Sequence, residues 1–252
     1  ADAAEAFGLG ENVPYDPSGA LEVRAAGQAF LDMRERIQRH LKQRTMILSG
    51  VSHDLRTPLT RLKLGLSFLP EEQREPLEKD VEDMNLLLNE FLDFAKQDNE
   101  TDLPTEDINP TVLVNELIEN FRRTGIQIES IGEIGNNLFK LKPFPIKRAL
   151  ENLINNADRY GKKILIEKKI ENNFLIFSVH DDGPGIDEAH YDEVLQPFTR
   201  LDPSRNQNRG SGVGLGLPIA KEIAEGQGGS LKLSKSDILS GLNAALIIPI
   251  DL

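Results

Sequence analysis

The sequence predicts a multidomain chain of the α plus α/β class, in which a helical hairpin precedes an α/β sandwich domain. Leucine recurs every seven residues from Leu41 to Leu69, and a second run of apolar residues with helical spacing follows Pro70. After residue 110, helix-like and strand-like segments are mixed. A chain of 252 residues has room for both parts.

The composition excludes several classes of protein. The chain has no cysteine, which excludes disulfides, a thiol nucleophile and zinc sites built on thiolates. Its net charge of −12 is a poor match for nucleic-acid binding, so we expect no nucleic-acid partner. The sequence has no apolar run of about 18 residues, the length that a membrane-spanning helix needs. It starts at Ala1 without a methionine or a signal peptide, and we expect a fragment whose upstream part is unseen.

The first helix carries a heptad seam. Residues 1–19 predict the end of one helix followed by a connector rich in glycine and proline, and the chain is helical in character from Ala20. The seam consists of apolar residues at heptad positions, namely Ile37, Leu41, Leu48, Val51, Leu55, Leu62 and Leu69. Arg44 interrupts it, and Pro58 should kink the helix because proline has no N–H to donate.

A second helix follows the turn at Pro70. Its apolar residues alternate in spacing between four and three, namely Leu77, Val81, Met84, Leu88, Phe91 and Ala95. Two helices joined by a short turn form an antiparallel hairpin, which we place at 38–98. One hairpin cannot bury both apolar seams, so we expect a homodimer that forms a four-helix bundle. The alternative is a hairpin that packs on its own C-terminal domain.

Residues 99–109 are polar and predict a linker, and the rest of the chain, 110–252, predicts one α/β domain. Helices are expected at 110–122, 144–160, 187–196 and 214–226. Strands are expected at 126–130, 137–141, 163–170, 174–180, 229–234 and 243–250, with a hairpin turn at 171–173. The helices should cover one face of the sheet.

Two turns in this domain have the composition of a nucleotide site. The segment 181–186 (Asp-Asp-Gly-Pro-Gly-Ile) follows a strand; its glycines let the backbone approach a ligand, and its carboxylate can accept a hydrogen bond from the exocyclic amine of a base. The glycine-rich segment 210–217 precedes an amphipathic helix, whose first N–H groups suit phosphate oxygens. It matches neither the P-loop nor the dinucleotide pattern. Taken singly, each segment is also typical of an ordinary turn or loop.

Polar residues on the expected helix 144–160 complete this constellation. The amide oxygens of Asn152 and Asn156 can ligate Mg²⁺, Arg159 can pair with phosphate, and Tyr160 can stack on a base. A long polar loop follows later, and its positive charges predict a lid over phosphates: Arg200, Arg205 and Arg209. A solvated helix face and an ordinary solvated loop are the alternatives.

His53 is the candidate nucleophile. It lies on the first heptad helix, two residues from Val51 and from Leu55, and should be exposed beside the seam. A neutral imidazole is a good nucleophile near neutral pH. Asp54 can hold the other ring nitrogen or accept its proton, and Thr57, one turn later, can position a water molecule. The other histidines, His40, His180 and His190, are expected to be solvated.

Five motifs in order resemble those of sensor histidine kinases, over about residues 40–252. Residues 52–61 resemble the H box, especially that of the osmosensor EnvZ and its relatives. The other matching segments are 148–160 (N box), 181–186 (G1 box), Pro197-Phe198 (F box) and 210–217 (G2 box). Residues 1–37 more weakly resemble the second half of a HAMP signalling module, at Glu22-Val23 and at 29–33.

This resemblance implies a dimerisation and phosphotransfer hairpin followed by a GHKL-type α/β sandwich, with ATP and Mg²⁺ as cofactors. It implies that His53 is the phosphoacceptor, that Asp54 is its general base, and that Thr57 serves a phosphatase reaction with Arg56. Asn156, assisted by Asn152, would hold the metal. The implied nucleotide-binding residues are Asn152, Asn156, Ala157, Asp158, Arg159, Tyr160, Asp181, Gly183, Gly185, Ile186, Phe198, Arg200, Leu201, Gly212, Val213, Gly214, Leu215, Gly216 and Leu217.

The implied reaction is autophosphorylation on His53, followed by transfer to an aspartate in the receiver domain of an OmpR-like response regulator. The implied location is the cytoplasmic portion of a bacterial inner-membrane protein with its membrane segments upstream. Val213 and Arg159 depart from the family, which commonly has a hydroxyl residue and a lysine there. Two alternatives are a stand-alone ATPase of the same superfamily, which would not need the heptad hairpin, and a pseudokinase adaptor, against which Asn152, Asn156 and Asp181 argue.

Overall fold

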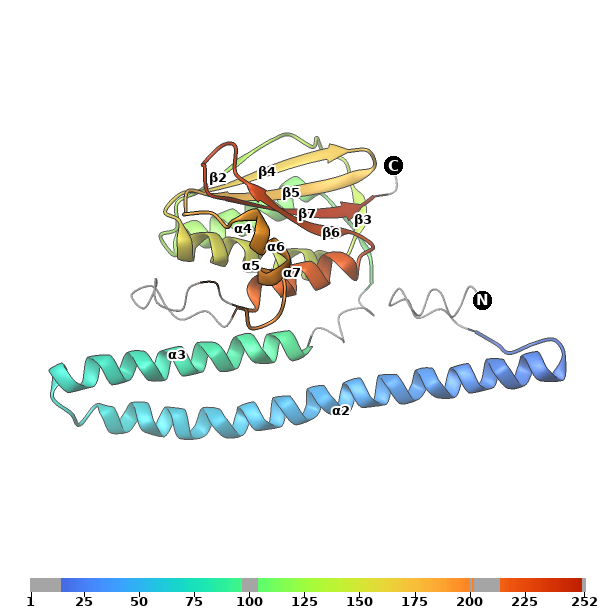
Figure 1. Ribbon diagram of the computed structural model, residues 1–252, viewed down its shortest axis with the longest axis horizontal. Coiled ribbons are helices and arrows are strands. Elements are labelled where there is room, and N and C mark those ends of the chain that lie inside the picture. The colour runs from blue at the N-terminus through green and yellow to red at the C-terminus, as the bar shows by residue number, and fades with distance from the viewer. Residues whose placement is uncertain (1–14, 97–103, 200, 202–213, 251–252) are drawn as a thin grey trace. The chain divides into compact units, whose positions relative to one another are not determined.

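The computed structural model describes residues 15–96, 104–199, 201 and 214–250, and only the backbone of some helical residues, His53 among them. The chain forms two compact units, Ala1–Asp102 and Leu103–Leu252 (Figure 1). Among the described helices, none combines the length and the apolar composition that a membrane crossing needs.

The first unit is a hairpin of two long helices, α2 (Leu21–Leu66) and α3 (Glu71–Lys96). The helix α2 has 46 residues and continues through Pro58, so the expected kink does not divide it. Proline cannot donate to the carbonyl of Asp54, so one bond of the helical ladder is missing at this point. Two polar contacts join the helices: Arg56 Nη2 donates to Asn89 Oδ1 at 3.1 Å, and Lys63 Nζ lies 2.8 Å from Glu82 Oε1.

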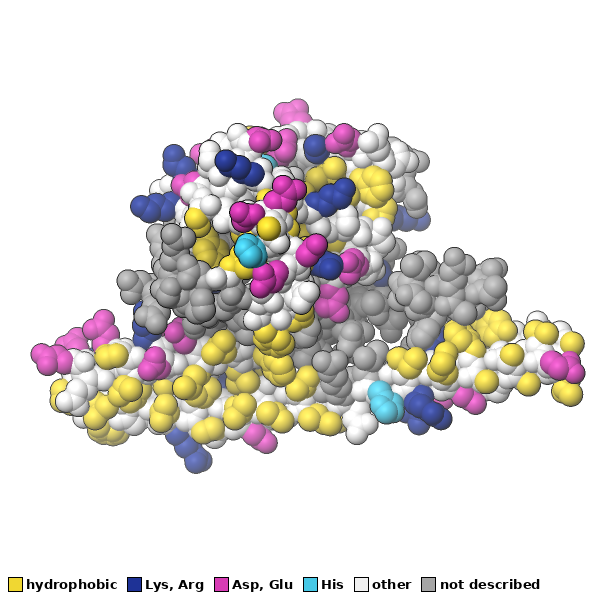
Figure 2. Space-filling model, viewed as in Figure 1, with side chains coloured by type: hydrophobic (Ala, Val, Ile, Leu, Met, Phe, Trp, Pro, Cys, Tyr) yellow, Lys and Arg dark blue, Asp and Glu magenta, His cyan; other side chains and the backbone are white. Residues whose placement is uncertain are grey.

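The hairpin leaves most of its described seam residues at least partly exposed. In the described part of the hairpin the buried side chains are Ser52, Leu66, Val81 and Leu92, and of these only Val81 belongs to an apolar seam. Five seam residues keep between 42% and 50% of their surface exposed, namely Val51, Leu55, Leu62, Leu77 and Met84. Figure 2 shows hydrophobic side chains along the hairpin. A single chain therefore leaves an apolar face uncovered, which is uncommon for a soluble monomer.

The second unit is an α/β sandwich. In chain order its elements are β1 (Glu106–Ile108), α4 (Pro110–Arg123), β2 (Ile128–Ile131), β3 (Phe139–Leu141), α5 (Pro143–Tyr160), β4 (Ile164–Glu171), β5 (Phe174–Asp181), η2 (Glu188–His190), α6 (Tyr191–Val194), α7 (Gly216–Glu225), β6 (Ser230–Lys235) and β7 (Leu242–Pro249). The main sheet has the order β2-β4-β5-β7-β6, and only its β2–β4 pair is parallel. The strands β1 and β3 form a separate antiparallel pair.

The helices α4, α5 and α7 cover one face of the main sheet (Figure 1). Successive side chains of β5 point to opposite faces of the main sheet. Leu175, Phe177 and Val179 lie on one face and are fully or nearly fully buried, so they contribute to the hydrophobic core of this unit. The turn between β4 and β5 uses Asn172 and Asn173, both at positive φ, which asparagine tolerates better than most residues.

The structure confirms the expected fold class and the order of the elements, and it corrects two details. The strand β1 lies inside the range predicted as a linker, where Glu106 pairs with Leu141 of β3. The helix expected at 187–196 is instead a 3-10 turn, η2, followed by the single turn α6. Asp187 caps this region by accepting from the backbone N–H of Ala189 at 3.0 Å.

Candidate functional site

The helix α5 connects the two ends of the candidate site. Asn152 and Asn156 are half-buried on α5, and Tyr160, its last residue, is exposed. The eight residues from Asn152 to Tyr160 correspond to a rise of about 12 Å along the helix. This length separates a region near the start of α7 from a region near the turn after β5, as a nucleotide separates its phosphates from its base.

The end near Asn152 has the features of an anion site. Asn152 Nδ2 donates to the carbonyl of Arg148 at 2.9 Å, which turns the amide oxygen outward. That oxygen faces Gly216, the first residue of α7, because a Cβ built on Gly216 would lie 3.6 Å from Asn152 Oδ1. The first N–H groups of a helix carry partial positive charge and attract phosphate. The start of α7 therefore lies opposite the amide oxygen of Asn152.

Gly214 joins this end to the segment around Phe198. Its φ is +77°, and a Cβ at this position would lie 2.5 Å from the carbonyl oxygen of Thr199, so only glycine fits. Its own carbonyl accepts from the backbone N–H of Phe198 at 3.1 Å. Phe198 also has a positive φ, of 66°, which is a strained conformation for this residue. Two motifs that were separate in the sequence thus meet here.

The end near Tyr160 is built around the carboxyl group of Asp181. Asp181 ends β5 and is buried; its Oδ1 accepts from the N–H of Gly183 at 2.8 Å and from that of Leu242 at 3.1 Å. Burial raises the pKa of Asp181, and the two N–H groups act in the opposite direction. Gly183 has no room for a side chain, because a Cβ there would lie 3.0 Å from the carbonyl oxygen of Tyr160. The end of α5 and the turn after β5 are therefore in contact.

The neighbouring Asp182 has a structural task. Its Oδ1 accepts from the backbone N–H groups of Lys162 at 2.6 Å and Lys163 at 2.9 Å. These bonds lower the pKa of Asp182, because they stabilise the ionised carboxylate. They tie the turn to the segment that follows α5. The two adjacent aspartates therefore differ in role, which the sequence alone did not separate.

Sequence reasoning missed four residues around Asp181, and His180 corrects one of its expectations. His180 was expected to be solvated, but it is buried and its Nδ1 lies 3.1 Å from Ser236 Oγ. Burial lowers the pKa of His180. Gly241 lies so close to Asp181 that a side chain there would overlap its carboxylate, and the next residue, Leu242, donates to that group. In the sequence, Gly241 between β6 and β7 is the feature that could have indicated this close approach to Asp181.

The remaining predicted residues have varied surroundings. Asp158 and Leu201 are exposed, and Arg159 and Ile186 are half-buried. Gly185 has a φ of +71°, which fits its place in the turn. Three predicted residues are buried in the core and support the site by packing: Ala157, Leu215 and Leu217. The predicted lid and part of the glycine loop lie outside the described residues, namely Arg200, Arg205, Arg209, Gly212 and Val213.

The candidate phosphoacceptor lies on the other unit. The backbone of His53 belongs to α2, but its side chain lies outside the described part of the chain, so its exposure stays a prediction. Asp54 and Thr57 are exposed on the same helix. His40 and His190 are exposed as expected, and His190 Nδ1 lies 2.8 Å from Glu193 Oε2.

The donor set of the site suits a nucleotide-bound Mg²⁺ better than a metal held by the protein alone. Among the described residues, there is no group of three or more histidine, aspartate or glutamate side chains that could hold a metal ion. Mg²⁺ commonly takes one or two protein oxygens and completes its shell with phosphates and water. The outward amide oxygen of Asn152, with Asn156 one turn later, fits that pattern.

Comparisons with known proteins agree with this geometry. The family described as "His Kinase A (phospho-acceptor) domain" matches residues 43–100, and the one described as "Histidine kinase-, DNA gyrase B-, and HSP90-like ATPase" matches 142–250. The sensor histidine kinase GtrS of Pseudomonas aeruginosa is 34% identical over 240 residues, which cover 92% of this chain and 49% of GtrS. The sensor histidine kinase CpxA of Escherichia coli is 30% identical over 250 residues, which cover 94% of this chain and 54% of CpxA.

The chain therefore spans about half the length of the curated relatives it matches. Among solved structures, full-length ShkA in complex with AMPPNP is similar, with a TM-score of 0.61 and 23% identity. The similarity covers 81% of this chain and 46% of ShkA. At this identity the likeness is one of fold.

Proposed function

Because this chain belongs to the sensor histidine kinase family, we propose that it is a kinase core that transfers the γ-phosphoryl group of ATP to His53 and then to an aspartate of a response regulator. The observation that carries the proposal is the geometry of α5. This helix brings Asn152 to the start of α7 and Tyr160 to the turn that holds Asp181. Motifs far apart in the sequence thus form one site with a phosphate end and a base end.

At the base end, Asp181 recognises adenine. One carboxylate oxygen is held by the N–H groups of Gly183 and Leu242, and the other is in position to accept from the exocyclic amine. A buried acceptor that needs a donor discriminates strongly against ligands that lack one. Tyr160, exposed beside this turn, packs on the base.

At the phosphate end, Asn152 and Asn156 would hold Mg²⁺, and the first turn of α7 and Arg159 would bind the phosphates. A magnesium ion held there would supply positive charge to the phosphate oxygens. The protein contributes position and electrostatics, because phosphoryl transfer passes through a loose transition state. Burial raises the pKa of Glu151, next to Asn152, and the nearby Lys147 and Arg148 act in the opposite direction.

In the transfer step, an imidazole nitrogen of His53 forms a bond to the γ-phosphorus while the bond from that phosphorus to the leaving ADP oxygen breaks. Asp54 accepts the ring proton, so the phosphohistidine forms without a positive charge on the ring. His53 and the nucleotide site belong to different compact units, so the reaction requires the two units to meet. Residues 99–105 serve as the linker that permits this movement.

The proposed partners follow from the hairpin. A second copy of the chain covers the exposed seam that includes Leu55 and Leu62 and completes a four-helix bundle. The receiver domain of an OmpR-like response regulator takes the phosphoryl group onto an aspartate, and Thr57 positions the water that hydrolyses this aspartyl phosphate in the phosphatase reaction. Residues 1–37 form part of a HAMP-like segment that leads to membrane segments upstream.

The test is phosphorylation of the purified chain with γ-³²P-labelled ATP. We expect His53→Gln to abolish incorporation and to leave ATP affinity unchanged, because residue 53 is outside the nucleotide site. His190→Gln is the matched control, since His190 is exposed and should not affect labelling. The label should be labile in acid and stable in alkali, which distinguishes a phosphohistidine from simple ATP hydrolysis. Labelling that survives His53→Gln contradicts the assignment.

A further inference from the structure

The loop 236–241, which joins β6 to β7, contacts both faces of the end of β5. Successive side chains of a strand point to opposite faces, so His180 and Asp181 lie on different sides of the sheet. On one side, Ser236 Oγ lies 3.1 Å from His180 Nδ1. At the end of the strand, Gly241 N donates to the carbonyl of Asp181 at 3.1 Å, and Leu242 N donates to its Oδ1 at 3.1 Å.

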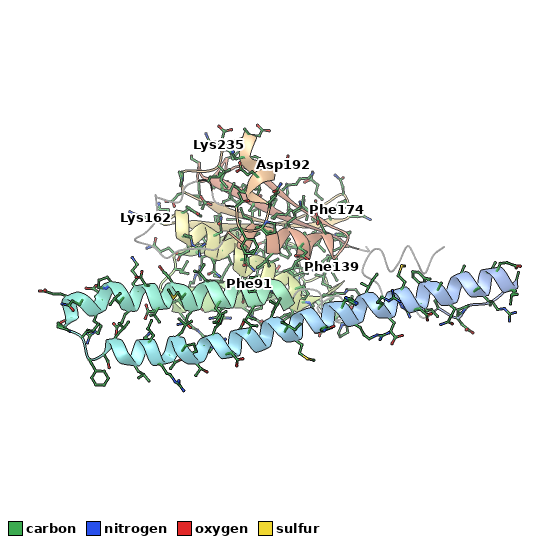
Figure 3. The ribbon with its side chains drawn as sticks, turned by 60° about the horizontal axis from the view of Figure 1, so that its bottom comes forward. Phe91, Phe139, Lys162, Phe174, Asp192 and Lys235 are labelled. Carbon is green, nitrogen blue, oxygen red and sulfur yellow. The ribbon has the colours of Figure 1, made fainter. Side chains whose placement is uncertain are left out.

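Figure 3 helps to locate this loop in the domain. Lys235, the last residue of β6, lies at the end of the sheet away from Phe174, the first residue of β5 (Figure 3). The loop that follows Lys235 is therefore at the same end of the sheet as Asp181. The strand register agrees, because Lys235 pairs with Leu242 and His180 pairs with Asn243.

The hydroxyl of Ser236 is the centre of the loop's hydrogen bonds. It accepts from Leu239 N at 3.0 Å, so its hydrogen can point to His180 Nδ1. In the neutral form with its hydrogen on Nε2, His180 would accept this hydrogen at Nδ1. The backbone of Ser236 also donates to the carbonyl of Gly241 at 2.8 Å and accepts from Ser240 N at 3.1 Å. Both side chains are buried, His180 to 4% exposure and Ser236 to 2%, so water does not replace a lost bond easily.

Three acidic groups are near enough to attract a proton to His180. Glu167 on β4 places Oε2 3.8 Å from His180 Nε2, which is too long for a hydrogen bond. Asp181 on β5 and Asp237 in the loop are the other two. Burial nevertheless outweighs their attraction for a proton and keeps the pKa of His180 below its usual range. The bond to Ser236 is therefore intact at neutral pH.

We propose that Ser236 and His180 are positioning residues for the base of the nucleotide. Their buried hydrogen bond fixes the loop 236–241, whose last residue, Gly241, binds the main-chain carbonyl of Asp181. The fixed loop places the next residue, Leu242, to hold one carboxylate oxygen of Asp181, so that the other accepts the exocyclic amine of adenine. The inference rests on the proposed function of the site, and it adds two residues that do not touch the ligand. Part of the preference for adenine therefore depends on His180, whose side chain lies on the sheet face opposite to that of Asp181.

The experiment compares the affinities of the full chain for ATP and ITP, which differ in that ITP carries a carbonyl in place of the amine. Wild type should prefer ATP. In Ser236→Ala we expect this preference to fall about five-fold, the scale of one hydrogen bond, with the affinity for ITP unchanged. Ser234→Ala is the matched control: its hydroxyl lies on the same face of β6 but accepts from Asn243 Nδ2 at 3.0 Å, and the preference should not change.

A pH series supplies a readout that a general loss of stability would not affect. Protonation of His180 places a hydrogen on Nδ1 and removes the acceptor for Ser236. The preference of wild type for ATP should therefore decline as the pH falls below the ordinary histidine value of about 6.5. Ser236→Ala should show a smaller decline, because it keeps only the titration of Asp181, whose pKa is raised by burial. The phosphates of ATP and ITP titrate alike, so the ratio isolates the effect on the base.

Two results would overturn the inference. Equal losses of ATP and ITP affinity in Ser236→Ala, or no loss of either, leave the ratio at the wild-type value. Asp181→Asn separates this failure from a failure of the proposed function. If Asp181→Asn abolishes the preference and Ser236→Ala does not change it, only the inference is wrong. If wild type does not bind ATP, or if Asp181→Asn keeps the preference, the proposed base recognition is wrong and the inference falls with it.

Discussion

Among glycine-to-alanine substitutions in the turn around Asp181, Gly241→Ala should cause the largest loss of stability and of ATP affinity. A Cβ at this position would overlap the carboxylate and the carbonyl oxygen of Asp181 and would lie 2.7 Å from the amide nitrogen of Gly183. Two of these three atoms are backbone atoms, which cannot rotate away as the end of a flexible side chain can. The loop 236–241 or the end of β5 must therefore move.

The size of the effect follows from the packing. Overfilling a well-packed site typically costs about 1–3 kcal/mol, and the overlap with backbone places Gly241→Ala near about 3 kcal/mol. For a unit of this size, each kcal/mol lowers the Tm by about 2–4 °C, so we expect a fall of about 6–12 °C. The affinity for ATP should fall at least about ten-fold, because the carboxylate that accepts the amine is displaced.

Differential scanning calorimetry is the appropriate assay, because the two compact units need not unfold together. The transition of the nucleotide-binding unit is the one that ATP shifts upward. Gly135→Ala is the control: Gly135 has a φ of +67° but no atom within 4 Å of an added Cβ. It should cost only the backbone strain of about 1 kcal/mol, or about 2–4 °C. Equal losses in the two variants, with ATP binding intact, would refute the packing argument.

Two further predictions concern the hairpin and the pH dependence. Leu62→Glu should weaken the dimer by about two to four orders of magnitude, since burial of leucine contributes about 1.5–3 kcal/mol in each copy. Sedimentation would show monomers, whereas the exposed, off-seam control Leu64→Glu should stay dimeric; two dimeric variants would contradict the seam. His180 has a lowered pKa, so the folded state binds its proton less readily, and stability falls as the pH drops below about 6.5. In melting curves the Tm of wild type should therefore drop relative to His180→Asn on acidification; a constant difference would disprove this linkage.

The features that could be predicted from the sequence depend on local periodicity. The seam through Leu55 and Leu62 predicted a helix whose apolar face one chain leaves exposed. The β-branched and aromatic composition of the segment 174–180 predicted a strand, which the structure has as β5. The strand β1 was missed because three residues with two acidic side chains show no alternation. Its existence depends on pairing with β3, about thirty residues later, which no local pattern contains.

In the candidate site, too, some residues could be predicted from local sequence and others depend on distant segments of the chain. Asp181, Asn152 and the glycines around them were identifiable because the chemistry of nucleotide binding restricts the residue types. His180 was misjudged because its burial comes from the loop at Ser236, which lies 56 residues later. The structural role of Asp182 was not predicted, because the sequence does not reveal that its carboxylate binds the backbone N–H of Lys162.

The unbroken length of α2 gives this helix the properties of a mechanical lever. From Leu21 to His53 the helix rises through 32 residues, or about 48 Å, and Pro58 comes only after the histidine. A tilt of about 5° at Leu21 therefore displaces the backbone at His53 sideways by about 4 Å if the helix pivots as a rigid rod. This displacement is larger than the distance of about 3 Å between the donor and acceptor atoms of a hydrogen bond. A small motion at the beginning of α2 is therefore enough to move His53 into or out of line with a phosphoryl donor.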